Sequence, residues 1–228
     1  MYELQELIKN GIKNMPTENT KPRIESVYYI SEIFKCIRQI YYSRTTEEKE
    51  VYSFSSLQNF AHGNITHELI QKILSNNTYN LKVFNEVQNL TINIDNIEVH
   101  GRLDTLLINE NNNKYIYEFK TCKDTTRISA PYLSHIQQLN YYLYFYNKST
   151  TFGSIVYVDK SNGNLLEFNT FRFSEELFNN MKKRVKEIDT AIKNKKLPDA
   201  EFKNEKNILC NFCFYKKKCD NDGTTTRT

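Results

Sequence analysis

Residues 100–121, HGRLDTLLINENNNKYIYEFKT, constrain the fold most strongly because they read as two β-strands joined by an asparagine-rich turn. Each strand carries an acid, Asp104 and then Glu118, where a strand favours apolar or β-branched residues. Lys120 lies one alternation beyond Glu118, so both side chains share one face of their strand, while Phe119 points the other way. A short turn would bring Asp104 beside Glu118. The stretch therefore predicts two acids and one base gathered on a sheet.

The rest of the chain alternates between helical and extended patterns. Apolar residues spaced by three and four predict helices at 31–41, 55–74, 131–147 and 174–196. Cys36 lies inside the first of these helices, and Pro131 lies in the first turn of the third. Alternation predicts strands at 83–90, 91–95, 97–108, 114–121, 152–159 and 165–173. The first thirty residues predict a short helix and a loop. This order favours an α/β domain with a central mixed sheet flanked by helices.

Composition narrows the class of protein without deciding it. With 228 residues, 39% of them hydrophobic, the chain can bury the core of one domain. A net charge of +4 is compatible with a nucleic-acid partner but does not demand one. No apolar run approaches the roughly 20 residues that span a bilayer, so we expect a cytoplasmic protein without a membrane partner. In that reducing compartment, the five cysteines favour metal or cluster ligands over disulfides.

Glu118 and Lys120 have a plain alternative, a charge pair on a solvated strand. The surrounding residues Tyr115, Ile116, Tyr117 and Phe119 instead indicate a central strand, where a partly buried acid needs a cation. Two carboxylates brought together repel unless a hard divalent ion lies between them. Oxygen ligands of this kind suit Mg²⁺ or Mn²⁺.

Further motifs give the acids a context. The hairpin carries G-x-x-D, ending at Asp104, and E-x-K, from Glu118 to Lys120. Upstream, GNITHELI has the form Gly-x-x-x-His, and downstream QLNYY has the form Gln-x-x-x-Tyr; these motifs contribute His67, Gln138 and Tyr142. Together they resemble the active-site signature of the PD-(D/E)xK nuclease superfamily, in its RecB-like branch. That resemblance implies a restriction-endonuclease-like core.

The resemblance also implies roles for these residues. His67, Asp104, Glu118 and the backbone carbonyl of Phe119 would hold the metal, with Lys120 acting on the attacking water. Gln138 and Tyr142 complete the catalytic set.

The residues from the upstream and downstream motifs also have a purely structural interpretation. A lone helix histidine is commonly structural, and tyrosines in YYLYFY commonly pack. The neighbouring register, Gln137 with Tyr141, also stays open. The imidazole favours Mn²⁺ over Mg²⁺, with Mg²⁺ as the alternative.

The tail NILCNFCFYKKKCDN holds Cys210, Cys213 and Cys219, three thiols that need a fourth ligand from Cys36 or Cys122. Cys36 lies in FKCIRQIYYSR, which resembles the C-x-R-x-x-Y-Y segment of iron-sulfur RecB-like nucleases, although this chain has isoleucine where the family usually has proline. The resemblance implies a [4Fe-4S] cluster on Cys36 and the three tail cysteines. Tetrahedral zinc is the rival, and Cys122 would be a small buried hydrophobe.

The motifs run from Cys36 to Cys219 and together resemble the CRISPR-associated RecB-type iron-sulfur exonucleases, number four in the Cas series, including viral relatives. The resemblance implies one RecB-like nuclease domain over 1–228, with the Cys36 region and 205–222 forming an iron-sulfur subdomain. It further implies a 5′ to 3′ exonuclease on single-stranded DNA or single-stranded ends, acting in CRISPR spacer acquisition and antiviral defence beside the Cas integrase complex.

Other functions stay open. One is a viral, repair or recombination exonuclease, which would work in the host cytoplasm if viral, and another is a non-catalytic iron-sulfur DNA-binding module. The oligomeric state is left open. For DNA contact the candidates are Arg38, Tyr42, Arg102, Gln138 and Tyr142, with Tyr41 and Tyr132 as further rings for base stacking.

Overall fold

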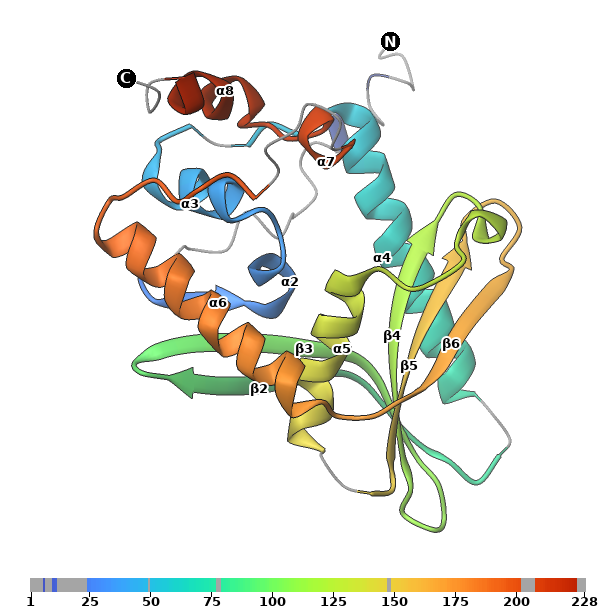
Figure 1. Cartoon of the computed structure of the whole chain (residues 1–228). Coiled ribbons are helices and arrows are strands. Elements are labelled where there is room, and N and C mark those ends of the chain that lie inside the picture. Colours follow the sequence, from blue (N-terminus) through green and yellow to red (C-terminus); the bar gives the residue numbers. More distant parts are fainter. Residues whose placement is uncertain are drawn as a thin grey trace. The chain divides into compact units, whose positions relative to one another are not determined.

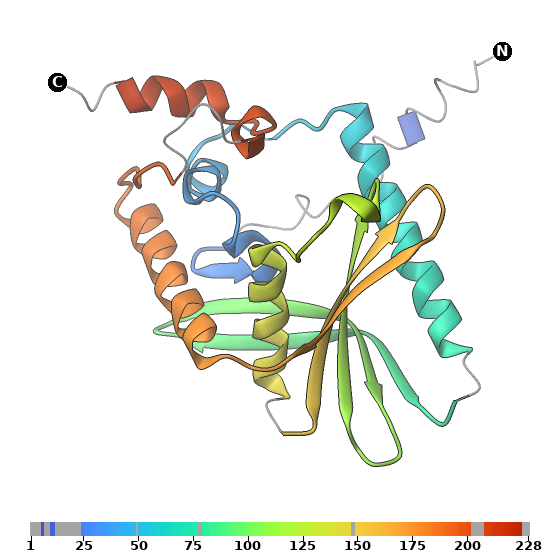
Figure 2. The same cartoon turned by 45° about the vertical axis from the view of Figure 1, so that its right-hand side comes forward.

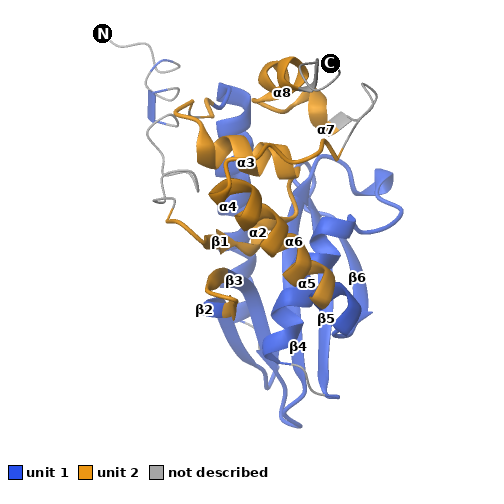
Figure 3. Cartoon of the chain, turned by 60° about the vertical axis from the view of Figure 1, so that its left-hand side comes forward, with its two compact units in different colours: residues 1–22, 52–91, 101–178 blue, residues 23–51, 92–100, 179–228 orange. Residues whose placement is uncertain are grey.

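The computed structural model describes residues 6, 10–11, 24–48, 50–76, 79–146, 149–201 and 208–224. The chain forms two compact units (Figure 3). Unit 1 comprises residues 1–22, 52–91 and 101–178, and unit 2 comprises residues 23–51, 92–100 and 179–228.

Unit 1 is built on a mixed sheet (Figure 1). Its strands are β2 (Lys82–Ile94), β3 (Ile97–Ile108), β4 (Lys114–Cys122), β5 (Thr151–Asp159) and β6 (Leu165–Phe171), of which β2 and β3 extend beyond the unit. β4 pairs antiparallel with β3 and parallel with β5, and β5 pairs antiparallel with β6. The parallel pair lies in the middle, where β5 is almost continuously buried, as expected for a strand covered on both faces. The predicted mixed sheet is thus confirmed.

Two long helices flank this sheet (Figure 2). α4 (Phe54–Ser75) begins after Ser53, whose hydroxyl accepts a hydrogen bond from the Ser56 amide. Its residues Ile70 and Leu74 pack on a core cluster around Phe119. α5 (Leu133–Phe145) instead contributes side chains that meet Glu118 and Lys120 of β4, and a short 3₁₀ turn, η2 (Thr125–Arg127), precedes it. Alternation along β4 therefore separates an apolar face from a polar one.

Gly101 explains how closely α5 approaches β3. A methyl group at Gly101 would lie 2.5 Å from a Tyr141 ring carbon and 2.9 Å from a Tyr142 ring carbon. Tyr141 is fixed there because its hydroxyl donates a 2.5 Å hydrogen bond to the Leu90 carbonyl. Only glycine leaves room for both rings, so the first residue of the G-x-x-D motif has a packing role.

Unit 2 contains the remaining elements. They are β1 (Val27–Tyr29), α2 (Ile30–Ile33), α3 (Ile37–Thr45), the larger part of α6 (Glu175–Lys193), α7 (Ile208–Asn211) and α8 (Lys216–Thr224). β1 pairs parallel with Glu98–His100 of β3. In its interior, the Tyr28 hydroxyl donates a 3.0 Å hydrogen bond to Asp189 of α6.

The single helix predicted around Cys36 is wrong. The chain forms α2 and α3 with a break between them, and Cys36 is the extended residue that precedes α3. The break has tertiary causes within unit 2. The Ile37 amide donates to the Glu201 carboxylate at 2.9 Å, and the Ile33 carbonyl accepts from Arg184 at 2.7 Å. These side chains take the backbone groups that a continuous helix would have paired internally.

Smaller differences concern element ends. Pro131 precedes α5 rather than lying in its first turn, and the tail contains α7 and α8, which the sequence pattern did not predict. Of the helix predicted near the N-terminus, the structure describes only residues 6 and 10–11, which are helical, and residues 205–207 of the predicted iron-sulfur subdomain lie outside the described residues. Among the helices that are described, none has the length and apolarity needed to cross a membrane.

Candidate active site

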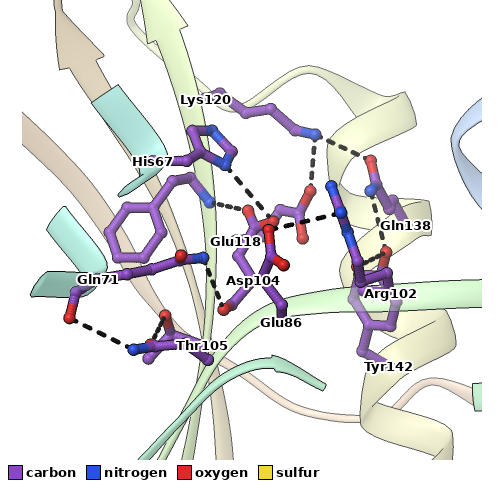
Figure 4. Close-up of polar contacts among 12 residues, drawn as sticks. His67, Gln71, Glu86, Arg102, Asp104, Thr105, Glu118, Lys120, Gln138 and Tyr142 are labelled. Carbon is purple, nitrogen blue, oxygen red and sulfur yellow. Dashed lines mark hydrogen bonds and ion pairs between the residues drawn. The ribbon is translucent and has the colours of Figure 1, made fainter. Parts of the chain in front are cut away.

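The two acids meet where β3 and β4 diverge. Pairing of these strands ends at Thr105 and Tyr117, and just beyond it Asp104 Oδ2 accepts a 2.8 Å hydrogen bond from the Phe119 amide (Figure 4). The Asp104 carboxylate thus accepts a hydrogen bond from a backbone amide of β4 that lies beyond the last β3–β4 residue pair. The neighbouring acid, Glu118, is 2% exposed. The predicted hairpin therefore brings both carboxylates together on adjacent strands.

Lys120 is held by a chain of hydrogen bonds that runs from β4 to α5. Its Nζ donates to Glu118 Oε1 at 2.7 Å and to Gln138 Oε1 at 3.0 Å. Gln138 Nε2 donates to the Tyr142 hydroxyl at 3.2 Å, and that hydroxyl donates to the Arg102 carbonyl at 2.9 Å. Every polar atom of the Gln138 amide group is engaged, so its orientation and that of Lys120 are fixed (Figure 4).

Of the two registers that the sequence left open, the structure brings Gln138 and Tyr142 to the acids. Tyr141, from the other register, is 1% exposed and bonds to the Leu90 carbonyl instead.

His67 enters the site from α4. Its Nδ1 lies 3.6 Å from Asp104 Oδ1, which is ion-pair rather than hydrogen-bond distance, and its ring packs edge-on against Phe119. Burial lowers the pKa of His67, but Asp104 first and Glu118 next outweigh it, so the pKa lies above its usual value. The imidazole is therefore drawn toward the two carboxylates.

Glu118 has a perturbed ionisation. Burial first, and the charge of Asp104 second, raise the pKa of Glu118 to about 7, although Lys120 favours the charged form. Among the described residues, its buried Oε2 has no hydrogen-bond partner. A buried carboxylate oxygen of this kind is unfavourable unless something positive approaches it.

The anionic oxygens of this site fit a hard divalent cation, the type of ion that PD-(D/E)XK nucleases typically use. The unsatisfied Glu118 oxygen and the neighbouring Asp104 carboxylate provide the anionic oxygens that such an ion prefers. As the side chains stand, no three histidine, cysteine, aspartate or glutamate residues within the described part of the chain are grouped so that they could hold a metal ion. Glu118 Oε1 accepts from Lys120 and Asp104 Oδ2 accepts from the Phe119 amide, so each acid has a second oxygen that these two donors do not use.

Three residues near the site were not singled out from the sequence. Gln71 follows His67 by one helical turn on α4, and its Nε2 lies 3.4 Å from the Asp104 carbonyl. The Thr105 hydroxyl donates to Asn85 Oδ1, and Asn85 Nδ2 donates to the Gln71 carbonyl, so β2 links β3 to α4 (Figure 4). The spacing of four between His67 and Gln71 is the one signal that the sequence offered.

Four of the five cysteines belong to unit 2. Burial first, and then the charges of Cys36, Cys210 and Cys219, raise the pKa of Cys213, so these four sulfurs are electrostatic neighbours. All of them are free thiols of intermediate exposure. Cys122 belongs to unit 1, where its thiol donates to the Val158 carbonyl at 3.6 Å.

The predicted DNA contacts divide into two groups. Arg102 is half exposed and pairs with Glu86, whereas Arg38 is 8% and Tyr42 is 1% exposed. Arg38 donates to the Pro198 and Cys219 carbonyls, and the Tyr42 hydroxyl donates to Asp222 at 2.8 Å. Contrary to expectation, burial and internal partners assign Arg38 and Tyr42 to the packing of unit 2.

Comparison with known structures places the fold. The crystal structure of SSO0001 has a TM-score of 0.66 and 20% sequence identity, covering 94% of this chain and 94% of that one. LHK-Exo in complex with dAMP has a TM-score of 0.50 and 14% identity, covering 75% of this chain and 90% of that one. A further crystal structure of LHK-Exo, an alkaline exonuclease from Laribacter hongkongensis, has a TM-score of 0.45 and 12% identity over the same shares. At these identities the similarity concerns the fold alone.

A comparison of sequences defines the family. None of the curated proteins searched matches this chain significantly. The family model described as the PD-(D/E)XK nuclease superfamily matches residues 30–220, a span that includes Asp104, Glu118 and Lys120. Because that match covers most of the sequence and the fold agrees with it, the chain belongs to the PD-(D/E)XK nuclease superfamily.

Proposed function

We propose that this nuclease hydrolyses DNA phosphodiester bonds with a divalent metal at the site of Asp104, Glu118 and Lys120. The observation that carries this proposal is the buried Glu118 carboxylate, with one oxygen on Lys120 Nζ and the other without a partner among the described residues. A simple charge pair would not need a second, unsatisfied oxygen beside another acid.

The metal ligands in this proposal are His67, Asp104, Glu118 and the carbonyl of Phe119. A bound Mn²⁺ or Mg²⁺ would polarise the scissile phosphate and lower the pKa of a water molecule. His67 favours Mn²⁺, since an imidazole nitrogen is a softer ligand than oxygen.

The chain's own residues supply the remaining chemistry. Lys120 orients or deprotonates the attacking water and offsets the negative charge that develops on the phosphate. Gln138 and Tyr142 keep Lys120 in position through the hydrogen bonds that end on the Arg102 carbonyl. Arg102, half exposed beside the site, stays a candidate for a phosphate contact.

The substrate in this proposal is single-stranded DNA or a single-stranded end, degraded by an exonuclease of 5′ to 3′ polarity. The similarity in fold to LHK-Exo, which was solved in complex with dAMP, supports a DNA substrate. The sequence motifs support a role in CRISPR spacer acquisition beside the Cas integrase complex. A viral, repair or recombination exonuclease outside CRISPR adaptation is the alternative.

The iron-sulfur cluster is a second part of the proposal. It would be a [4Fe-4S] cluster on Cys36, Cys210, Cys213 and Cys219, within one RecB-like nuclease domain whose Cys36 and tail regions form the cluster-binding part. The mutual electrostatic influence of these four sulfurs supports it. Tetrahedral zinc on the same four cysteines is the rival.

The decisive experiment is cleavage of end-labelled single-stranded DNA by anaerobically purified protein with Mn²⁺. We expect the wild type to degrade the strand and both a chelator and Lys120→Ala to abolish degradation. Lys186→Ala is the matched control, because Lys186 is half exposed and pairs with Asp95 on the surface of unit 2. A folded wild-type protein that binds DNA but cleaves none would overturn the proposal in favour of a non-catalytic DNA-binding module.

A further inference from the structure

One histidine beside the site has no part in the chemistry above. His135, Gln138 and Tyr142 are spaced by three and four residues, so they share one face of α5. Gln138 on that face bonds to Lys120 Nζ. His135 therefore lies one helical turn from Gln138, toward the start of α5.

Tyr157 connects His135 to the strand that bears Lys120. Tyr157 of β5 is the Cα partner of Lys120 in the parallel β4–β5 pair, so the two side chains project from the same face of the sheet. The Tyr157 oxygen lies 2.8 Å from His135 Nδ1. The Lys120 charge also acts on both groups: it adds to the effect of burial in lowering the pKa of His135, and it partly offsets the rise that burial causes in the pKa of Tyr157.

The contact between Tyr157 and His135 is compatible with a proton on either ring nitrogen of His135. We assign the proton of this contact to the Tyr157 hydroxyl, which donates to His135 Nδ1 while its oxygen accepts from the Tyr132 amide at 3.0 Å. The ring proton of His135 then lies on Nε2. Burial, and secondarily Lys120, lower the pKa of His135 to about 3, so the ring is neutral near pH 7. Nε2 has no hydrogen-bond partner within the described residues.

Tyr132 completes a small aromatic cluster. Its ring packs edge-on against His135, with centroids 5.4 Å apart, and edge-on against Tyr157. Despite these contacts it is 61% exposed. A ring held by its neighbours but largely open to solvent suits stacking on an unpaired base, which every base allows because each has a π-face.

We propose that Tyr132, His135 and Tyr157 form a nucleotide subsite beside the catalytic lysine. In this subsite His135 Nε2–H donates to a backbone phosphate next to the scissile one, and Tyr132 stacks on a base of the same strand. Tyr157 is a positioning residue, since it fixes the His135 tautomer and contacts no DNA. The inference rests on the proposed function for its substrate, a single-stranded nucleic acid, and adds a site that recognises one phosphate through a neutral donor.

Binding of synthetic strands tests the subsite directly. The strands carry one uncharged methylphosphonate, moved from position to position, and are bound to Lys120→Ala protein with or without His135→Phe. We expect one position where the methylphosphonate weakens binding about tenfold with His135 present and has no further effect with His135→Phe. His135→Gln should restore part of the loss, because its amide N–H can replace Nε2–H. An abasic nucleotide should couple in the same way to Tyr132→Ala.

Salt dependence separates this contact from a cationic one. A neutral donor releases no counterions, so His135→Phe should lower affinity without changing the slope of log affinity against log salt. Arg102→Ala, which removes a positive charge, should reduce that slope.

The outcomes distinguish the two proposals. If no methylphosphonate position couples to His135, the subsite is wrong even where the wild type cleaves DNA. A general loss of affinity at all positions would likewise mean a structural role. If the wild type cleaves nothing, the nuclease proposal fails. The subsite is then tested by binding alone, through the coupling between His135→Phe and the methylphosphonate position.

Discussion

Lys120 Nζ lies 2.7 Å from Glu118 Oε1, and this bond satisfies only half of a carboxylate that is 2% exposed. The other oxygen, Oε2, is buried and has no partner among the described residues. Asp104 adds a second negative charge next to it, which together with burial raises the pKa of Glu118 to about 7. The metal-free site therefore carries a destabilising charge that a cation would relieve.

Glu118→Gln should stabilise the metal-free protein above pH 7. The folded-state pKa of about 7 exceeds the ordinary value of 4.5, so between these values the folded protein holds a proton that the unfolded chain has lost. Stability from this group thus falls as pH rises through that window, by roughly 3 kcal/mol at most. Urea unfolding with a chelator at pH 5 and pH 8 should show the gain from Glu118→Gln chiefly at pH 8. Equal gains at both values would contradict the assigned ionisation.

Addition of Mn²⁺ should reverse the order of stability of the wild type and Glu118→Gln at pH 8. Wild-type protein at pH 8 should gain stability with Mn²⁺ concentration, because an ion that binds only the folded state stabilises it by mass action. Glu118→Gln should gain little, since it lacks the anionic oxygen. Thermal unfolding over a Mn²⁺ titration measures the difference, and an identical rise in both proteins would remove Glu118 from the metal site.

Gly101→Ala should destabilise the protein by roughly 1–3 kcal/mol, because the added methyl would overlap the Tyr141 and Tyr142 rings. Displacing those rings moves α5, so nuclease activity should fall as well. The matched control is Gly63→Ala in α4, where the nearest atom to the new methyl is Thr121 Oγ1 at 3.7 Å. That change should stabilise the helix by up to about 1 kcal/mol. Unfolding assays should show lower stability for Gly101→Ala and higher stability for Gly63→Ala. Cleavage assays should show reduced activity for Gly101→Ala.

Tyr142→Phe should lower cleavage about tenfold because it releases Gln138, and through it Lys120, from the Arg102 carbonyl. Tyr141→Phe removes a hydroxyl of similar burial that bonds to Leu90 instead. Both variants should lose roughly 1 kcal/mol of stability. If Tyr141→Phe reduces cleavage as much as Tyr142→Phe, the hydrogen-bonded chain to Lys120 has no special role.

His135 should make the protein sensitive to mild acid. Its folded-state pKa of about 3 is below the ordinary value of 6.5, so below pH 6.5 the unfolded chain binds a proton that the folded protein does not bind. Stability from this group is fully present above pH 6.5 and decreases as pH falls, by roughly 2 kcal/mol at pH 5. His135→Gln should flatten this part of the pH–stability curve in denaturant titrations. A curve as steep as that of the wild type would show that His135 ionises freely.

Cys36→Ser should remove the iron and sulfide of anaerobically purified protein together with its visible absorbance, because the cluster would lose one of four ligands. Cys122→Ser should leave all three unchanged, since that thiol bonds within unit 1 to the Val158 carbonyl. Zinc found in place of iron in the wild type would decide for the rival metal.

Local pattern predicted the hairpin of β3 and β4 because alternation and turn chemistry act over a few residues. The same kind of reasoning failed at Cys36, where apolar residues at helical spacing continue through the break between α2 and α3. Glu201 and Arg184, which take the backbone groups there, are distant in sequence. Their effect on residues 33–37 could not be predicted from a local window.

The sequence by itself determined which residues alternate, and hence that Glu118 and Lys120 share a face of β4 beside Asp104 on β3. It also determined the Gln-x-x-x-Tyr spacing and favoured Gln138 with Tyr142, but left the neighbouring register open. Only the tertiary structure chose Gln138 over Gln137, because the glycine at 101 sets how α5 packs and thereby which amide reaches Lys120. Burial raised the pKa of Glu118, and tertiary contacts enclosed Arg38 and brought the Tyr157 hydroxyl to His135. These properties depend on contacts between distant segments, which no local pattern contains.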